Sequence, residues 1–255
     1  MKTIHLLLAG ALMMSAARAE DGAPELAARM NALQQDGTSL IRLKMDLPQG
    51  TLQVQIKQRR TAGTTEAVYQ VLWPKERAGE AVMLKKSGKQ GPTGAMLTPP
   101  DTVRTLDAGQ MKGGVFGSDL AYADVVENFF AWEHQAIVGT ENVGRTSCEI
   151  LESKPGKGDR SIYSSVKTWV DTKRLVPMKV EKYSAGGQLA RRIDTTRVVT
   201  QDGRAMPANL TVHDVLKGTA TELDGSNIKR GVAFDEREFT TEGLKMTAPQ
   251  RGKSE

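Results

Sequence analysis

Apolar and polar side chains alternate along most of the chain, which is typical of β-strands with one buried face. In residues 40–47 and 52–57, apolar side chains recur at every second position, and the turn sequence Pro48-Gln49-Gly50 lies between the two runs. Two such runs across a short turn predict a β-hairpin. Similar runs predict further strands at residues 67–73, 80–85, 95–99, 103–106, 135–138, 148–153, 164–170, 178–183, 189–199, 208–215 and 219–223.

Helical spacing is confined to two places. Apolar residues predict an N-terminal helix over residues 24–35, with Pro24 in its first turn and Gly37 just past its end. A short central helix is expected around Val125 and Val126, capped by Asp119 or Ser118. The surrounding segment, residues 113–132, is rich in glycine and is interpreted as a structural or lid-forming element.

The order of these elements predicts a mainly β protein of the α+β class. The pairs Gly186-Gly187 and Asp202-Gly203 are typical of tight hairpin turns. Strands follow one another without intervening helices, which favours a mostly antiparallel sheet of roughly ten to twelve strands. We expect residues 20–255 to form a single domain built on one large curved sheet.

The first residues have the layout of a secretory signal peptide. Lys2 supplies a positive start, residues 4–14 form a short apolar run, and Ala17-Arg18-Ala19 is a small-residue cleavage motif. The run is shorter than the about 20 apolar residues that a membrane span needs. We therefore predict a signal peptide over residues 1–19, cleavage before Glu20, and a mature protein in the periplasm.

Composition argues against several functional classes. Of the 255 residues, 39% are hydrophobic and 5% are aromatic, and the formal net charge is +5. With glycine counted in place of tyrosine, the hydrophobic share is roughly 47%, which suits a globular domain. The few aromatic side chains argue against a surface that stacks nucleic-acid bases. Because Cys148 is the single cysteine, an internal disulfide and a multi-cysteine metal site are excluded.

Sequence motifs of common catalytic sites are missing. The chain contains no G-x-S-x-G elbow, no phosphate-binding G-x-x-x-x-G-K loop and no dinucleotide-binding G-x-G-x-x-G. His134 and His213 have no neighbour at metal-ligand spacing, so we expect neither a metal nor a cofactor. Without a nearby base in the sequence, Cys148 is expected to face a core rather than to act as a nucleophile.

Charged residues cluster in a few places. Acidic groups gather at Asp119, Asp124 and Glu127 and again at residues 235–238, and they are interpreted as helix caps and solvated faces. A glycosidase would need carboxylates on facing walls of a cleft, which clustering in sequence does not supply. Pairs of basic residues lie near predicted strand ends, at residues 59–60, 85–86, 191–192 and 229–230. They would bind anionic headgroups or phosphate, or they would be solvated charges that discourage pairing between strand edges.

Several short motifs occur in a characteristic order. Residues 117–124 read GSDLAYAD, and TWVD follows at residues 168–171. LVPMKVE at residues 175–181 and DGRAMP at residues 202–207 come next. This ordered set resembles the outer-membrane lipoprotein-sorting protein family, the LolA-like periplasmic proteins, over most of residues 39–245.

The resemblance implies a strongly curved, incomplete antiparallel β-barrel whose N-terminal and short central helices cover its open side. The concave face would be apolar and hold acyl chains, and the protein would not be an enzyme. We therefore expect a periplasmic binding protein or chaperone that carries a lipid or a lipidated protein toward the outer membrane. Its partners would be an acyl chain and inner- or outer-membrane transport components, with no nucleic acid.

Strand alternation identifies the residues expected to line this cavity. Side chains two positions apart leave the same face of a strand, so each predicted strand contributes its apolar members together. An ordinary packed core would show the same pattern, and both interpretations stay open. The expected ligand-binding residues are Leu52, Val54, Ile56, Met178, Val180, Leu210 and Val212.

Two other functions remain open. A lipid-sensing regulatory protein on the same fold would bind an anti-sigma-type protein partner. A hydrolase with scattered carboxylates would lose turnover when Asp119 or Asp124 is changed.

Overall fold

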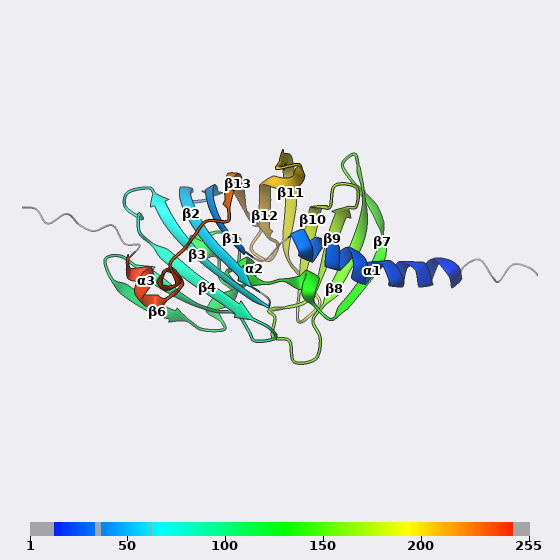
Figure 1. Ribbon diagram of the computed structural model, residues 1–255, viewed down its shortest axis with the longest axis horizontal. Helices are drawn as coiled ribbons and strands as arrows, with labels where there is room; N and C mark the ends of the chain where they lie inside the picture. The colour runs from blue at the N-terminus through cyan, green and yellow to red at the C-terminus, as the bar shows by residue number, and fades with distance from the viewer. Residues whose placement is uncertain (1–12, 34–36, 62, 247–255) are drawn as a thin grey trace, which may run out of the picture.

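All strands belong to one antiparallel sheet that stays open at both edges. The computed structural model describes residues 13–33, 37–61 and 63–246. The 13 strands lie in the order β6-β5-β4-β3-β2-β1-β13-β12-β11-β10-β9-β8-β7 and form a strongly curved surface (Figure 1). Their bounds are β1 Gly37–Leu47, β2 Gly50–Thr61, β3 Thr64–Trp73, β4 Ala81–Ser87, β5 Thr93–Thr98, β6 Thr102–Leu106, β7 His134–Val143, β8 Thr146–Lys154, β9 Tyr163–Asp171, β10 Val176–Ser184, β11 Leu189–Gln201, β12 Arg204–Asp214 and β13 Thr219–Arg230.

This strand order divides the chain into two meanders. Consecutive strands pair within β1–β6 and within β7–β13, and the pairing of β1 with β13 joins the two halves. Ser39 lies opposite Arg230 in that pair, and Asp46 lies opposite Glu222. Because β6 and β7 form opposite edges of the sheet, the segment between them must cross from one edge to the other. We call this segment, residues 107–133, the central segment.

The strand positions and the fold class predicted from alternation are confirmed, although the 13 strands of the described residues exceed the expected ten to twelve. β1 and β2 form the expected hairpin, with Leu47 paired to Gly50 across its turn. The turn between β11 and β12 has the expected tight geometry, because Asp202 and Gly203 both have positive φ angles, of 53° and 74°.

A helix covers the concave side of the β7–β9 end. This helix, α1, spans Met13–Leu33 and packs mainly against β7 and also against β8 (Figure 1). Its apolar face follows helical spacing and is almost completely buried. The side chains that form this contact are Ala23, Leu26, Ala27 and Met30 of α1 and Phe130, Leu151 and Val170 of the rest of the chain.

The start of α1 differs from the prediction. The helix begins at Met13, so the placement of Pro24 in its first turn was wrong, and this proline lies inside the helix. Proline donates no backbone hydrogen bond, and the neighbouring Ala23 is fully buried in the contact between α1 and the rest of the chain. Residues 1–12 of the predicted signal peptide lie outside the described residues. No described helix is long and apolar enough to cross a membrane.

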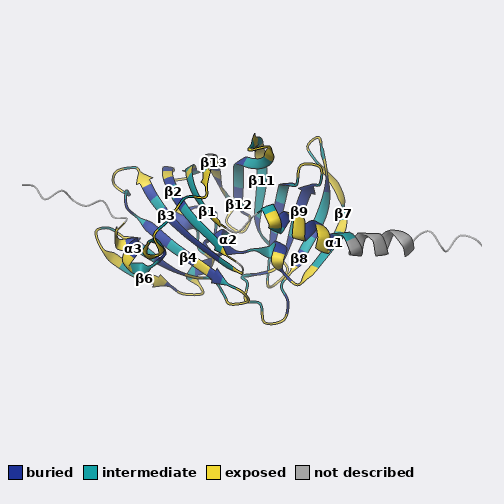
Figure 2. Cartoon of the chain, viewed as in Figure 1, coloured by how far each residue is buried: buried dark blue, intermediate teal, exposed yellow. Residues whose placement is uncertain are grey.

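The C-terminal residues cover the other face of the sheet at its β3–β5 end. The 3-10 helix η4, Glu236–Phe239, and the helix α3, Thr241–Met246, pack there. They bring Phe239 and Leu244 against Val68, Ala81, Ala95 and Leu97. Strand β3 is therefore buried on both faces, which accounts for its nearly continuous buried stretch in Figure 2.

Candidate functional site

The central segment covers the concave face of β1–β4 and β12–β13. It contributes the buried side chains of Met111, Val115, Phe116, Tyr122, Val125 and Val126 to one hydrophobic cluster. The predicted cavity residues Leu52, Val54, Ile56 and Val212 belong to the same cluster, and Leu210 packs half-buried at its border. The chain's own side chains pack against these residues.

The two remaining predicted cavity residues lie farther along the sheet. Val180 is buried in a second cluster with Trp132, Tyr163 and Val166. Met178 is half-buried in a register irregularity, where Pro177 pairs with Val170 and Lys179 already pairs with Trp169. The Arg174 guanidinium lies 3.9 Å from the Met178 sulfur. The structure therefore does not bring these residues into one pocket with Leu52 and its neighbours.

A buried ionic network fastens the central segment to the sheet. The short helix α2, Tyr122–Val126, carries Asp124, whose carboxylate is fully buried. Asp124 Oδ1 lies 2.8 Å from Lys182 Nζ of β10 and accepts a 2.7 Å hydrogen bond from the Tyr163 hydroxyl of β9. Burial and the neighbouring carboxylate raise the pKa of Tyr163, so its hydroxyl keeps its proton.

Arg191 extends this network to the next strands. Its Nε atom lies 3.5 Å from Asp124, and its Nη1 atom lies 2.7 Å from Asp214 at the end of β12. Its Nη2 atom donates to the carbonyl of Lys112 in the central segment. Burial alone would raise the pKa of Asp214, but hydrogen bonds from Arg191 and Lys217 lower that pKa to about 2.

Asp119 has a different role from the predicted one. The expected helix cap was wrong, because α2 begins after Ala121 and the Asp124 side chain accepts the backbone hydrogen bond of Ala121. Asp119 is buried and accepts hydrogen bonds from the hydroxyls of Thr219, at 2.5 Å, and Thr221, at 2.8 Å. It therefore pins the central segment to β13.

The turn that carries Asp119 has unusual backbone geometry. Phe116 is buried with a positive φ of 54°, a value rarely adopted by bulky residues. A Cβ atom on Gly114 would lie 1.6 Å from the carbonyl oxygen of Ser118, so only glycine fits there. Arg77 and Gln49 donate to the carbonyls of Phe116 and Gly117, which holds this turn against the rim of the sheet.

A second buried ion pair holds the central segment just after α2. Lys86 Nζ lies 3.1 Å from Glu127 and 3.3 Å from Asp159. The indole nitrogen of Trp132 also donates to Glu127. Burial raises the pKa of Glu127, although the Lys86 charge opposes this effect. Asp124 and Glu127 thus attach α2 and the residue that follows it to the sheet by buried charges.

An apolar pocket remains open where the C-terminal end of α1 meets the sheet. This cavity of about 380 Å³ is lined by apolar residues from α1, η3 (Phe129–Ala131), β10 with its preceding turn, and β12, which are Met30, Leu33, Phe130, Leu175, Pro177, Ala205, Met206 and Pro207. Polar residues complete its lining, namely Gln201, Asp202, Arg204 and Arg230. The half-buried Leu33, Leu175 and Met206 leave apolar surface exposed to solvent. We call this cavity the apolar pocket.

None of these residues was among the predicted ligand-binding residues. The lining comes from elements far apart in the chain, and several of its members precede or follow a predicted strand. One local signal was present: the LVPMKVE and DGRAMP motifs contain Leu175, Pro177, Arg204, Met206 and Pro207. Leu175 also has a positive φ of 54°, which the sequence does not reveal.

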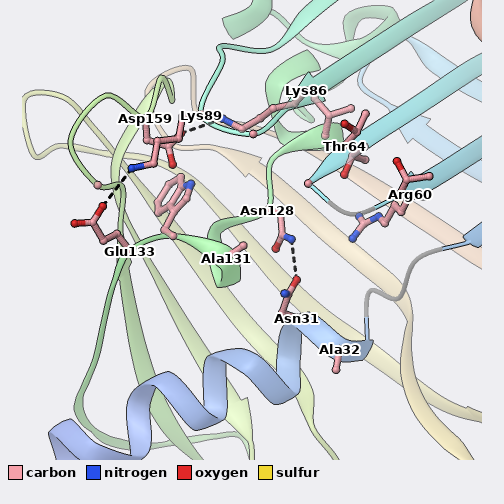
Figure 3. Close-up of a pocket in the computed structure, with 17 residues that line it drawn as sticks. Asn31, Ala32, Arg60, Thr64, Lys86, Lys89, Asn128, Ala131, Glu133 and Asp159 are labelled. Carbon is pink, nitrogen blue, oxygen red and sulfur yellow. Dashed lines mark hydrogen bonds and ion pairs between the residues drawn. The ribbon is translucent and has the colours of Figure 1, made fainter.

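A larger polar pocket lies on the other side of the end of α1. This cavity of about 960 Å³ is lined by Arg60, Lys86, Lys89, Glu133 and Asp159, among others (Figure 3). Asn31 of α1 and Asn128 of the central segment face each other here and are joined by a 2.8 Å hydrogen bond. The last turn of α1 therefore separates an apolar pocket from a polar one.

The cysteine, the histidines and the C-terminal acidic cluster form no catalytic or metal-binding arrangement among the described residues. Cys148 is buried and burial raises its pKa, which disfavours the reactive thiolate. His213 lies 3.1 Å from Asp194, and His134 is exposed. In the acidic cluster near the C-terminus, Asp235 caps η4 as interpreted from the sequence. Among the described residues, no group of three His, Cys, Asp or Glu side chains could hold a metal ion.

Comparisons with known proteins are consistent with this architecture. A family model described as "-like: Uncharacterized protein" matches residues 63–246. The chain belongs to this family. The comparison with curated proteins found no match.

Solved structures share the fold over nearly their whole length. A DUF1329 family protein from Desulfovibrio piger ATCC 29098 has a TM-score of 0.79 at 19% identity, with 89% of this chain and 99% of that chain covered. A putative outer membrane lipoprotein-sorting protein domain from Vibrio parahaemolyticus has a TM-score of 0.77 at 21% identity, with the same coverage of 89% and 99%. A LolA superfamily protein from Nitrosomonas europaea has a TM-score of 0.62 at 19% identity and covers 88% and 97%. The LolA-like fold predicted from the motifs is confirmed.

Proposed function

We propose that this protein is a non-catalytic binding protein that holds the acyl chain of a lipid or lipidated protein in the apolar pocket. The observation that carries the proposal is an open cavity of about 380 Å³, lined mainly by apolar side chains, on the concave side of the sheet. Moving apolar surface out of water contributes about 0.8 kcal/mol per buried CH₂ group. An acyl chain supplies such groups in a row, so it matches this pocket chemically.

The residues predicted to line the cavity would bind a ligand only after a conformational change. Leu52, Val54, Ile56, Leu210 and Val212 contact the central segment in the structure. They could contact a ligand only after the central segment moves away from the sheet. We propose that these residues, together with Met178 and Val180, form a second apolar binding surface beneath that segment. Binding there requires the buried ion pairs of Asp124 and Glu127 to open.

The fold supports a carrier role in the periplasm. Its solved relatives include a putative outer membrane lipoprotein-sorting protein domain. We propose that residues 1–19 form a signal peptide, that the mature protein acts in the periplasm, and that it delivers its ligand toward the outer membrane through transport components. N-terminal sequencing of periplasmic protein should read from Glu20. A folded protein that retains residues 1–19 in that compartment would contradict the export proposal.

The central test is replacement of Leu175 by asparagine. Leu175 lines the pocket at a positive φ, which asparagine adopts more readily than leucine, so Leu175→Asn should preserve the fold. The change removes part of the apolar wall and adds an amide. A half-buried leucine contributes about 1 kcal/mol, so a fluorescent fatty acid should bind at least about fivefold more weakly.

Leu216→Asn is the matched control, because Leu216 is 66% exposed in the turn between β12 and β13. It should bind the probe like the wild type. If wild type binds no acyl probe, or if Leu175→Asn binds as tightly as the control, the pocket does not hold an acyl chain.

Native purification separates this proposal from the regulatory alternative. Mass spectrometry of an organic extract should find an acyl ligand bound to the purified protein. A stoichiometric protein partner without acyl ligand would instead favour the lipid-sensing regulatory function.

A further inference from the structure

The mouth of the apolar pocket carries charged side chains, whereas its interior is apolar. Met30 and Phe130 in its wall are buried, whereas Asp202, Arg204 and Arg230 in the same lining are exposed. The two arginines come from neighbouring strands, at the start of β12 and the end of β13. The cavity is therefore amphipathic, with cationic side chains where it opens to solvent.

The two arginines at this mouth are unpaired among the described residues. Neither Arg204 nor Arg230 has an ion pair or side-chain hydrogen bond within the part of the chain that the structure describes. Elsewhere on the sheet, the exposed Arg197 lies 3.3 Å from Asp224 and the half-buried Arg192 lies 2.9 Å from Asp194.

The one carboxylate in the pocket lining does not neutralise this pair of arginines. Asp202 occupies the tight turn between β11 and β12 and forms no ion pair with either guanidinium. Gln201, also in the lining, donates to the carbonyl of Ile228 at 3.0 Å, which ties β11 to the end of β13. Among the described lining residues, the mouth thus carries two guanidinium groups and one carboxylate, with no ion pair between them.

Guanidinium groups stay protonated and present several donors in a plane, which suits the oxygens of a carboxylate or phosphate. We propose that the ligand is an amphiphile with an anionic headgroup, whose acyl chain enters the apolar pocket while its carboxylate or phosphate lies between Arg204 and Arg230. This inference rests on the proposed function, because it requires an acyl chain in the pocket. It goes further by naming the headgroup chemistry.

The test compares a fluorescent fatty acid with its methyl ester, which has the same chain and no charge. Wild type should bind the acid about tenfold more tightly than the ester at low salt, and the difference should shrink as salt is raised. The double variant Arg204→Gln, Arg230→Gln should lose this preference and bind the ester like the wild type. Both side chains are exposed, so the fold should be unchanged by circular dichroism.

Arg197→Gln is the matched control, since it removes an exposed arginine from β11 outside the pocket. It should keep the preference for the acid. Equal binding of acid and ester by wild type, or an equal loss in the control, would overturn the headgroup assignment. If neither probe binds, the proposed acyl-binding function fails as well.

A competition experiment distinguishes binding of a lipid headgroup from binding of a free anion. Inorganic phosphate lacks the acyl chain, so it should displace the fatty acid only at concentrations far above that of the probe. Displacement at concentrations similar to the probe's would assign the arginines to a free-anion site and overturn the amphiphile proposal.

Discussion

The buried charge of Asp124 should be essential for holding the central segment on the sheet. Replacement by asparagine keeps the side-chain shape and keeps one acceptor oxygen, which can serve either the Tyr163 hydroxyl or the Ala121 backbone N–H but not both. It removes the negative charge beside Lys182, which is only 3% exposed and lies 2.8 Å away. Removing one partner of a buried ion pair leaves an uncompensated charge and costs about 3–5 kcal/mol.

Urea unfolding followed by circular dichroism measures this cost. Asp124→Asn should lower the free energy of unfolding by that amount, whereas Asp224→Asn should lower it by less than about 1 kcal/mol, since the Asp224–Arg197 pair is half exposed. The double variant Asp124→Asn, Lys182→Met removes both buried charges and should recover part of the loss.

The reasoning is refuted if Asp124→Asn unfolds at the same urea concentration as Asp224→Asn. It is also refuted if the double variant is less stable than the single one, because the uncompensated lysine would then not be the source of the cost.

Three further outcomes follow from buried residues. Val54→Asp places an unpaired charge at a site that is 1% exposed, so it should destabilise the fold by about 3–5 kcal/mol in urea unfolding, while Gln53→Asp on the exposed face should not. Asp119→Ala leaves the buried Thr221 hydroxyl and the half-buried Thr219 hydroxyl without their acceptor and should cost about 1–3 kcal/mol in urea unfolding. Unchanged stability together with the loss of a hydrolytic activity would instead favour the enzyme function. The pKa of Asp214 falls from 3.8 to about 2 on folding, so its contribution to stability is present above pH 4 and is lost as pH falls toward 2. Asp214→Asn should flatten that part of the profile of unfolding free energy against pH, and an unchanged profile would contradict this assignment.

The site was harder to predict than the strands. Period-two alternation placed Leu52, Val54 and Ile56 on one face correctly, because the alternation depends only on the geometry of a single strand. It could not show whether that face meets a ligand or another part of the chain. The cap assigned to Asp119 failed for a related reason, since its hydroxyl partners are Thr219 and Thr221, 100 and 102 residues away.

The sequence by itself determined the fold class, the positions of the strands and the hairpin turns, since these depend on neighbouring residues and on local backbone preferences. The tertiary structure decided which part of the concave face is covered and which is open. The strand order puts β6 and β7 at opposite edges, so the chain between them must cross the face and fill it. The apolar pocket exists only because Met30, Leu175, Met206 and Arg230 meet at the end of α1. No local pattern encodes that meeting, because these residues become neighbours only when the whole sheet has formed.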